Sequence, residues 1–512
     1  MPGVSDPLVL AVDQGTSGTT SLLVTPGGEV AGRAYEPVRV AYPRDGWVEQ
    51  DAEELWRSVQ AACAAVVRDT DGSPVALGIT NQRETLVVFD RRTLRPVAPA
   101  IVWQDRRTAA ICAEHRDRGE EEAIRRRTGL IVDPYFTATK IEWLLRQDPS
   151  LRARAERGEI CATTVDGWLV ARLTAGAVVS TDASNASRTL LCDLRGGGFD
   201  PDLCALFSVP ERLLPEVRDS AGVAGETAPE ELCGLRIPIA GVAGDQQAAL
   251  FGQACLRPGM SKNTYGTGSF VLTNCGTDAP QAAHGVLTTV AWRIDGTTTY
   301  ALEGSIFVTG AALRWLVELG LLTTPADAAG VFDSVADAGG CYFVPALTGL
   351  GAPWWDPDAR GAFLGLSAGA TRAHMVRAVV ESMAYRTRDV VEAMEQVSGL
   401  PFEELRVDGG ASRIDGLCQF QADLLGIPVT RAASVEATAF GAAMLAALGS
   451  ELIDLAAVEH AWSPGRRFEP ASSGSRPSEA YAGWLDAVQR VRTAAGQRKR
   501  PEGKPSGLSG RE

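Results

Sequence analysis

The chain has 512 residues, of which 45% are hydrophobic and 22% charged, so a soluble globular protein of two or more domains is expected. Its formal net charge of −14 indicates neither a nucleic-acid partner nor an anionic membrane surface. There is no signal-peptide pattern, no apolar run of membrane-spanning length and no C-x-x-C pair among the 10 Cys, so we expect a cytoplasmic protein with reduced thiols and no membrane insertion.

The first predicted element is a strand at Leu8–Val12, which leads through a polar turn at Asp13–Thr20 into a second strand. Glycines let the backbone approach a ligand, and the turn's hydroxyl and N–H groups suit phosphate oxygens. Asp13, at the strand end, suits a Mg²⁺ that bridges phosphates. The spacing matches neither a dinucleotide-binding fingerprint nor a P-loop. An ordinary Gly/Thr hairpin explains this stretch alone equally well.

Two short strands then end in polar or aromatic residues. The strand at Ala76–Ile79 is followed by Arg83 and Glu84, which together can donate to and accept from a small polyhydroxy ligand. A surface ion pair of little energetic value is the alternative. The strand beginning at Ala100 leads to Trp103, whose ring face suits the C–H side of a polyol, although Trp103 could equally be core. Tyr135 precedes a predicted helix and offers a hydroxyl.

The polar run Ser180–Ser187 predicts a connecting loop. Beyond it, a buried strand at Ile237–Ala243 and a turn at Gly244 place Asp245 and Gln246 before a helix. Ligands bind at such strand ends in open α/β sheets, where a carboxylate can take a proton from a substrate hydroxyl. The alternative is that Asp245 merely caps the helix.

We place the boundary between halves near Cys255–Gly259, giving an N-terminal domain at 1–254 and a C-terminal domain at 255–495. The second half opens with another strand, Gly/Thr hairpin and strand at Lys262–Thr273, which suggests an internal duplication with a nucleotide clamped between the hairpins. A helix is expected to start at Glu303–Gly310.

Later in the second half, a strand at Leu405–Asp408 ends in a Gly pair that includes Gly410, where a base or ribose phosphate can lie against backbone. A helix of small residues at 435–448 should pack closely on the sheet. The basic tail 496–512 is expected to be disordered, with a nucleic-acid arm as the alternative.

Together these stretches resemble the FGGY carbohydrate kinases, and in particular the members that phosphorylate glycerol. The resemblance extends from about Leu8 to about Val491. It depends on motifs that match in order: Asp13-Gln-Gly-Thr, Gly46-Trp-Val-Glu, Gly78-Ile-Thr-Asn-Gln-Arg-Glu84, Val102-Trp-Gln, Asp133-Pro-Tyr, Ala243-Gly-Asp-Gln-Gln-Ala-Ala-Leu-Phe-Gly252, Lys262-Asn-Thr-Tyr-Gly-Thr-Gly268, Gly349-Leu-Gly-Ala-Pro353 and Arg406-Val-Asp-Gly-Gly410.

The resemblance implies an α/β fold of two actin/hexokinase-type (ribonuclease H-like) ATPase domains with a catalytic cleft between them. It implies transfer of the ATP γ-phosphoryl group to glycerol with Mg²⁺, giving sn-glycerol 3-phosphate in glycerol catabolism. By the same resemblance Asp245 matches the general base, and Asp13 and Asp245 are the carboxylates near the metal. The positions that match glycerol ligands are Arg83, Glu84, Trp103, Tyr135, Asp245, Gln246 and Phe270. Those that match nucleotide contacts are Gln14, Gly15, Thr16, Ser17, Gly18, Thr267, Gly310, Arg314, Gly410, Ala411 and Asp415.

The chain also departs from the family pattern. Thr20 stands where a basic residue is usual, and Lys262 or Arg106 could replace the missing charge. Arg314 and Asp415 stand where Gln and Asn are common. The run Cys233-Gly-Leu-Arg236 replaces a Gly-Gly-Thr-Arg loop that binds fructose 1,6-bisphosphate, and no histidine lies at the activating position, so neither control is expected in its familiar form.

Two alternatives to glycerol phosphorylation stay open: a kinase of this family for another polyol or a ketose, and a catalytically weak, actin-like ATP-binding protein. Members of the family are often homodimers or homotetramers, and we expect one of these states.

Overall fold

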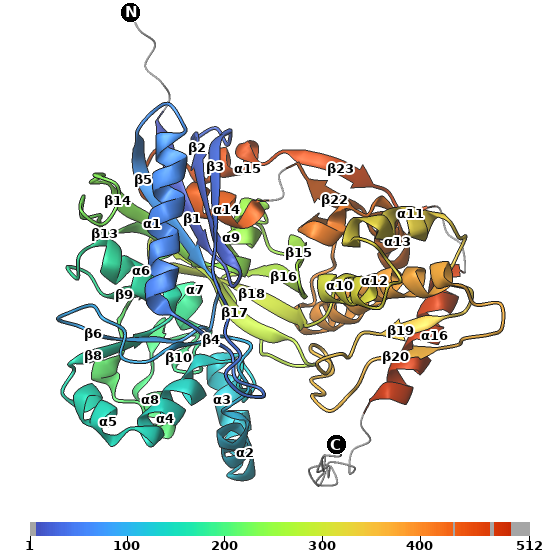
Figure 1. Cartoon of the computed structure of the whole chain (residues 1–512), viewed down its shortest axis with the longest axis horizontal. Coiled ribbons are helices and arrows are strands. Elements are labelled where there is room, and N and C mark those ends of the chain that lie inside the picture. Colours follow the sequence, from blue (N-terminus) through green and yellow to red (C-terminus); the bar gives the residue numbers. More distant parts are fainter. Residues whose placement is uncertain (1–6, 434–435, 472–475, 493–512) are drawn as a thin grey trace, which may run out of the picture.

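The structure, a computed structural model, describes residues 7–433, 436–471 and 476–492. Within these ranges, one mixed sheet of 13 strands runs through both halves of an α/β molecule (Figure 1). In sheet order the strands are β23 (Pro464–Phe468), β22 (Val429–Ala432), β21 (Leu405–Asp408), β15 (Ser261–Tyr265), β16 (Ser269–Gly276), β18 (Thr297–Ile306), β17 (Leu287–Ile294), β13 (Ala221–Glu226), β14 (Pro238–Gly244), β5 (Pro74–Asn81), β1 (Leu8–Gln14), β2 (Gly18–Val24) and β3 (Val30–Pro37).

The N-terminal part of the sheet is covered on both faces. Successive side chains of a strand point to opposite faces, so β1 supplies two different cores. Leu8, Leu10 and Val12 pack with helices α1 (Ala52–Arg68) and α6 (Val165–Leu173). Val9 and Ala11 pack with α9 (Asp245–Gly252) and α14 (Ala437–Gly449). This double burial explains why β1 is apolar without a break from Leu8 to Val12.

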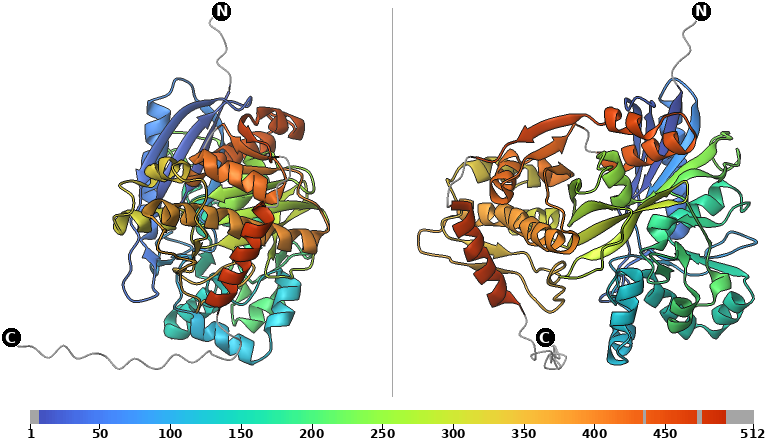
Figure 2. Two further views of the ribbon diagram at one scale, coloured as in Figure 1. Left: turned by 90° about the vertical axis from the view of Figure 1, so that its right-hand side faces the viewer. Right: turned by 180° about the vertical axis from the view of Figure 1, so that it is seen from behind.

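Helix α14 packs against the N-terminal strands and α9, and the right-hand view of Figure 2 shows this orange-red segment beside the blue strands. A Cβ on Gly78 of β5 would overlap the Ala442 carbonyl, and a Cβ on Gly441 would overlap the carbonyl of Ala248 in α9. The predicted close packing of this small-residue helix is therefore confirmed. The surface it covers belongs to the N-terminal part, although α14 comes late in the chain.

The other half of the sheet packs against its own helices in one large core, which includes Tyr265, Phe343 and Trp484. Its helices are α10 (Gly310–Glu318), α11 (Ala328–Asp333), α12 (Arg372–Ser398), α13 (Asp415–Leu425) and α16 (Arg476–Val491), with single turns η2 (Pro325–Asp327) and η3 (Gly410–Arg413) and the strand pair β19 (Tyr342–Val344) and β20 (Ala362–Leu364). Helix α15 (Leu455–Ala461) packs instead with α14 and the N-terminal strands, through Val458.

A third packed region extends from the N-terminal half around Phe136 and Phe207. Its elements are β4 (Glu49–Gln50), β6 (Val87–Asp90), β7 (Ala100–Ile101), α2 (Ala109–Asp117), α3 (Glu121–Thr128), α4 (Thr137–Gln147), α5 (Pro149–Glu156), β8 (Ile160–Thr163), β9 (Ser180–Asp182), α7 (Ala183–Ala186), β10 (Cys192–Asp193), β11 (Gly198–Phe199), α8 (Pro201–Leu206), η1 (Glu211–Leu213) and β12 (Glu216–Arg218).

The two predicted hairpins occupy equivalent places. β1 pairs antiparallel with β2 and parallel with β5, while β15 pairs antiparallel with β16 and parallel with β21. This repeated pattern supports the internal duplication. The division at 254/255 stays a prediction, because the sheet is continuous and α14 packs across it.

One local prediction was wrong and another needs a later boundary. The polar run Ser180–Ser187 is not a connecting loop: it forms β9 and α7, and all its residues are buried. Its side chains satisfy one another, since Asp182 accepts from the backbone N–H groups of Ser184 and Asn185. The helix expected to start at Glu303–Gly310 forms as α10, but it begins only at Gly310, and Glu303 lies inside β18. The tail 496–512 lies outside the described residues. None of the helices within the described ranges has the length and hydropathy of a membrane-spanning segment.

Candidate functional site

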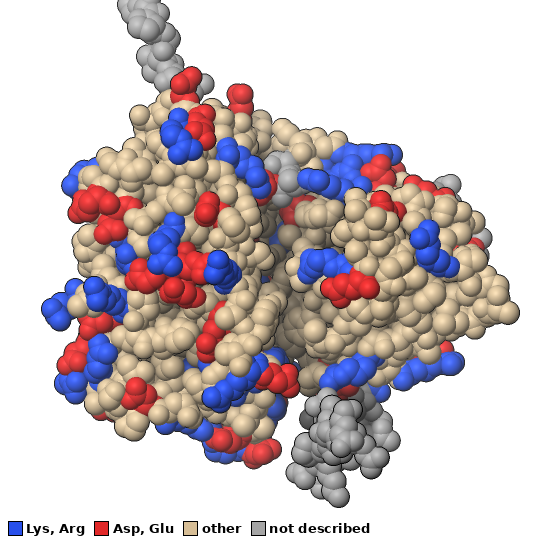
Figure 3. Space-filling view, viewed as in Figure 1, with Lys and Arg blue, Asp and Glu red and all other residues tan. Residues whose placement is uncertain are grey.

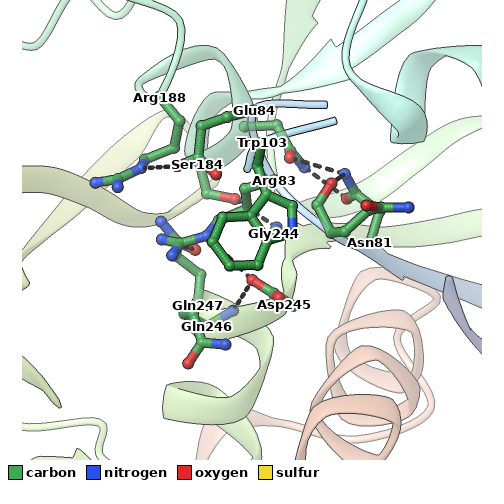
Figure 4. Close-up of polar contacts among 12 residues, drawn as sticks. Asn81, Arg83, Glu84, Trp103, Ser184, Arg188, Gly244, Asp245, Gln246 and Gln247 are labelled. Atoms are coloured by element: carbon green, nitrogen blue, oxygen red, sulfur yellow. Dashed lines mark hydrogen bonds and ion pairs between the residues drawn. The ribbon is translucent and has the colours of Figure 1, made fainter. Parts of the chain in front are cut away.

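The site begins where two parallel strands end together. β5 and β14 run side by side, with Asn81 in register with Gly244. The residues just beyond, Arg83 and Asp245, therefore meet, and Arg83 Nε lies 3.0 Å from Asp245 Oδ1 in an ion pair (Figure 4). Arg83 is almost fully buried, whereas the Asp245 side chain keeps 29% of its exposure. The carboxylate is thus held from the protein side and open on the other.

Asp245 is more than a helix cap. The N-cap of α9 is Gly244, and Asp245 is the first residue of the helix. Its Oδ1 accepts one short-range bond from the Gln246 backbone N–H, at 2.7 Å. That leaves Oδ2 without a described donor, so the arrangement suits a carboxylate that takes a further proton or cation.

Three aromatic rings enclose the space beside Arg83 and Asp245. Trp103 lies 5.8 Å edge-to-face from Tyr135 and 6.4 Å from Phe270, measured between ring centroids. The Arg83 guanidinium carbon lies 5.7 Å from the Phe270 ring centroid. Trp103 and Phe270 are partly exposed, so they are not simply core residues. The wall is apolar and suits C–H groups, while the charges suit hydroxyls.

Behind this wall lies a buried network of four charges. Glu303 of β18 accepts from both Arg83 and Arg188, with Arg188 Nη2 at 2.8 Å, and Arg188 Nε donates to Glu84 Oε1 at 2.6 Å. The two guanidinium groups outweigh burial and lower the pKa of Glu303 to about 2. Burial raises the pKa of Glu84, and Arg83 and Arg188 oppose the rise. Arg83 thus forms ion pairs with residues of both halves of the chain, Asp245 in the first and Glu303 in the second.

Gln246 lies beside a buried cation. Lys262 of β15 donates from Nζ to Gln246 Oε1 and, at 2.9 Å, to Thr264 Oγ1. Burial lowers the pKa of Lys262 to about 8, although the carboxylates of Asp408 and Asp245 raise it. Lys262 therefore supplies positive charge to the Asp245 region. Arg106, the other suggested substitute for a basic residue at position 20, instead pairs with Asp133 at 2.6 Å.

The turn of the first hairpin, Gly15–Ser17, touches the aromatic wall. Trp103 Nε1 donates to Thr16 Oγ1 at 2.9 Å, and Gln82 Nε2 reaches the Gln14 amide oxygen at 3.2 Å. Ser17 is exposed, and Gly18 is constrained by packing, because a Cβ there would overlap the Tyr35 hydroxyl. The hairpin therefore lies directly against the candidate acceptor pocket.

Asp13 lies opposite Thr20 in the β1–β2 register. Burial, followed by the carboxylates of Asp245 and Glu436, raises the pKa of Asp13 to about 8. Clustered acidic oxygens with this shortage of positive charge fit a divalent cation that takes few protein ligands and keeps its waters. No group of three or more His, Cys, Asp or Glu in the described ranges could by itself hold a metal ion. A cation here would need phosphate oxygens and water as its other ligands.

The second hairpin brings together three of the predicted nucleotide contacts. The backbone N–H of Gly310, at the start of α10, donates to Gly266 O at 3.0 Å. Arg314 Nη2 lies 3.4 Å from Thr267 Oγ1. A Cβ on Gly310 would come within 2.6 Å of the Gly266 carbonyl oxygen, so glycine is required there.

Beside it, β21 runs parallel to β15 and ends at the Gly pair. Gly409 has φ of +84°, and a Cβ on Gly410 would meet nothing within 4 Å. Ala411 is buried in η3. The open backbone at Gly410 leaves room for a flat group, and the contact itself stays a prediction. Asp415 is engaged elsewhere: it pairs with Arg466 and, at 2.9 Å, with Arg431.

Sequence reasoning missed Arg188 and Glu303 because both were assigned to the wrong local structure. Arg188 directly follows the run that was predicted as a loop, and Glu303 was placed at a helix start. A signal existed for Glu303: it ends the run Thr297–Glu303, whose β-branched and aromatic residues are typical of a strand.

A separate hollow of about 930 Å³ lies near β4 and β7. Glu49–Glu53, Thr93–Pro99 and Arg172 line it, and none of the predicted site residues does. It reaches the first hairpin only through Gln50, whose Nε2 donates to Thr16 O at 2.8 Å. The candidate site lies instead between the two hairpins. Figure 3 shows a hollow in the surface between the two large parts of the molecule.

These features define a class of protein. The model for the FGGY family of carbohydrate kinases, N-terminal domain, matches residues 8–252, and the C-terminal domain model matches residues 261–450. The chain belongs to the FGGY family of carbohydrate kinases, and the two-domain α/β fold predicted from sequence is confirmed.

Within that family, the chain is most usefully compared with glycerol kinases. The glycerol kinase of Halorhodospira halophila is 50% identical over 486 residues, which are 94% of this chain and 96% of that protein. The glycerol kinase of Dechloromonas aromatica is 49% identical over 491 residues, 95% of this chain and 98% of that protein. The crystal structure of Plasmodium falciparum glycerol kinase with ADP superposes with a TM-score of 0.89 at 31% identity, covering 95% of this chain and 98% of that one.

Proposed function

We propose that this protein is an ATP-dependent glycerol kinase, which transfers the γ-phosphoryl group of ATP to glycerol and yields sn-glycerol 3-phosphate. The observation that carries the proposal is the half-open Asp245 carboxylate, held by Arg83 at 3.0 Å and faced by Trp103 and Phe270. Relatives named glycerol kinase that are about half identical over nearly the full chain support the choice of acceptor.

The acceptor side of the reaction follows from these groups. Arg83 donates to one hydroxyl of the triol and Glu84 accepts from another, while the rings of Trp103, Tyr135 and Phe270 cover its C–H face. Gln246 adds a polar contact. Asp245 accepts the proton of the attacking hydroxyl as its oxygen bonds to phosphorus. Because Arg83 fixes one oxygen of Asp245, the other is aimed at the acceptor.

The donor side lies between the hairpins. Backbone N–H and hydroxyl groups of Gln14–Gly18 hold the phosphates of ATP, and Thr267, Gly310, Arg314, Gly410 and Ala411 hold its nucleoside part. Asp415, which pairs with Arg431 and Arg466 at the start of α13, is left out of the proposed nucleotide contacts. A Mg²⁺ held by Asp13, with Asp245 nearby, would neutralise charge on the phosphates. Lys262 adds a fixed positive charge where Thr20 supplies none.

The experiment is ADP release from Mg·ATP, with glycerol, with no acceptor, and with a panel of polyols and ketoses. Release should depend strongly on glycerol. Asp245→Asn keeps the shape of the side chain but removes the base, so kcat should fall by about 10²–10⁴-fold. Asp295→Asn, in the exposed turn between β17 and β18, is the matched control and should leave kcat unchanged.

Release that depends on another sugar alone would replace glycerol as the substrate and keep the base. Release that needs no acceptor would favour an actin-like ATPase. Sedimentation of the same preparation would test the expected homodimer or homotetramer. Adding fructose 1,6-bisphosphate should leave the rate unchanged, since the run Cys233-Gly-Leu-Arg236 lacks the Gly-Gly-Thr-Arg pattern.

A further inference from the structure

The segment Ser180–Arg188 is polar and yet completely buried. Burying polar groups gives little stability by itself, so a buried polar segment usually serves to fix a geometry. What this segment touches is therefore informative. Its side chains contact the ends of the two strands that carry Arg83 and Asp245, and then the charges behind the acceptor pocket.

Two of its side chains hold the strand ends. Ser184 Oγ accepts the backbone N–H of Gly244 at 2.9 Å, immediately before Asp245. Asn185 and Asn81 exchange two amide hydrogen bonds, at 3.0 and 3.1 Å, at the end of β5. The segment thus fixes β5 and β14 relative to each other at the point where the acceptor residues begin.

Arg188 fixes the residues themselves. Its Nε donates to Glu84 at 2.6 Å and its Nη2 to Glu303 at 2.8 Å, while Glu303 also accepts from Arg83. Glu84 has φ of +58°, a conformation that non-glycine residues rarely adopt, so its position needs support. Arg188 has no exposed surface and therefore cannot touch an acceptor in the pocket.

We propose that Arg188 is a positioning residue for the acceptor: through Glu84 and Glu303 it fixes both hydroxyl-binding groups of the proposed glycerol site. Without Arg188, Glu84 loses a charged hydrogen-bond donor. Glu303 then pairs with Arg83 alone, and Arg83 shifts relative to Asp245. The proposal rests on the proposed polyol kinase function. It assigns to this buried arginine a defined effect on the acceptor and none on the nucleotide.

The test is steady-state kinetics of Arg188→Lys with glycerol and Mg·ATP varied separately. Lysine keeps the charge but cannot bond Glu84 and Glu303 together in a planar fork. Because a misplacement of about 1 Å costs about 100-fold in rate, kcat/KM for glycerol should fall by about 100-fold. The KM for Mg·ATP should stay within about twofold of native, since none of the hydrogen bonds and ion pairs described for Arg188, Glu84 and Glu303 reaches the hairpin turns.

Arg386→Lys is the control for the loss of a buried arginine. Arg386 is likewise buried, and it pairs with Asp389 at 2.8 Å within α12, with no described hydrogen bond or ion pair to the acceptor residues. Both variants should unfold at lower temperature, but only Arg188→Lys should raise the KM for glycerol. Ser184→Ala, which removes one hydroxyl from the same segment, should raise that KM in the same sense and tests the idea if Arg188→Lys does not fold.

A second measurement is the double-mutant cycle of Arg188→Gln with Glu84→Gln. Coupled residues should give a combined loss in kcat/KM smaller than the product of the single losses. If the two single losses in kcat/KM multiply in the double variant, or if the KM values for glycerol and for Mg·ATP change equally, the role is merely structural and the proposal is overturned. A native protein without any acceptor-dependent ADP release would overturn the proposed function first, and that outcome is seen before any variant is made.

Discussion

Lys140 is the residue whose environment is hardest to reconcile with its usual chemistry. It is fully buried in α4, and its Nζ donates to the carbonyls of Glu84 and Tyr135, at 2.8 and 2.9 Å. Burial lowers its pKa to about 7. A neutral amine still has two N–H groups, one for each carbonyl, so the contacts survive deprotonation. Lys140 therefore supports the two acceptor residues whether or not it is charged.

The lowered pKa of Lys140 makes the free energy of unfolding depend on pH, in a direction that follows from the shift. Between pH 7 and the ordinary lysine pKa of 10.5, the unfolded chain binds one more proton at Lys140 than the folded chain, so folding becomes more favourable as pH rises. The free energy of unfolding of the native protein, minus that of Lys140→Met, should increase by up to about 1.4 kcal/mol per pH unit. Urea unfolding at pH 7, 8 and 9 measures it; a difference that does not change with pH contradicts the assignment.

Glu303 behaves in the opposite way. Its pKa is lowered to about 2 by two arginines, so its stabilisation is complete above the ordinary value of 4.5 and is lost as pH falls toward 2. Glu303→Gln leaves Arg83 and Arg188 less well paired and should cost about 3–5 kcal/mol of unfolding free energy at pH 7. The gap between native and variant should shrink below pH 4.5 in denaturant titrations. A gap that stays constant down to pH 3 would refute the pairing.

Single residues also show what sequence could and could not reveal. Arg83, Trp103 and Asp245 were found because each follows an apolar strand, and strand ends in α/β sheets collect ligand groups. Arg188 and Glu303 were missed because their importance depends on contacts between residues more than 100 positions apart in the chain. Local patterns carry no record of such pairings.

At the scale of elements, glycines set how closely α14 approaches its neighbours. Gly441 faces the Ala248 carbonyl of α9, and Gly252 faces the Ala437 carbonyl of α14. A methyl group at either place must separate the helices, and α9 begins with Asp245. The small-residue pattern predicted close packing, but it could not say that the helix returns to the first half of the sheet.

Gly441→Ala should therefore lower the free energy of unfolding by about 1–3 kcal/mol, the usual cost of overpacking. Gly330→Ala is the matched control, because Gly330 lies in α11 with nothing near its added methyl group. That change should raise stability by about 0.5–1 kcal/mol through helix propensity. Chemical denaturation of both variants decides the matter, and equal effects would argue against the close α9–α14 contact.

At the scale of the whole molecule, the two halves share one sheet and one site. The first half contributes Arg83 and Asp245, and the second contributes Phe270, Glu303 and Lys262. α14 also crosses back to cover the first half. Sequence patterns predicted two halves with repeated hairpins. They could not predict that α14 covers the first half, because that depends on a helix late in the chain packing against strands early in the chain.

We therefore expect residues 1–254 expressed alone not to fold stably. The fragment lacks α14, so one face of β1, β5 and β14 would be exposed, and Arg83 and Arg188 would lose Glu303. Circular dichroism with thermal unfolding should show no cooperative transition, while the full chain should show one. A cooperative transition for the fragment would establish 1–254 as an autonomous domain.

The sheet that unites the two halves has a very short strand pairing between β13 and β17. β13 and β17 pair in register only at Ala221 with Ile294, joined by the Ser220 N–H bond to the Arg293 carbonyl at 2.7 Å. β1 and β5, in contrast, pair along their whole length, from Leu8 to Gln14. Tilting one half of the sheet against the other at this pairing would therefore break the fewest backbone hydrogen bonds. The ion pair of Arg83, which follows β5, with Glu303 of β18 connects the two sides of the pairing and would act as the hinge point between them.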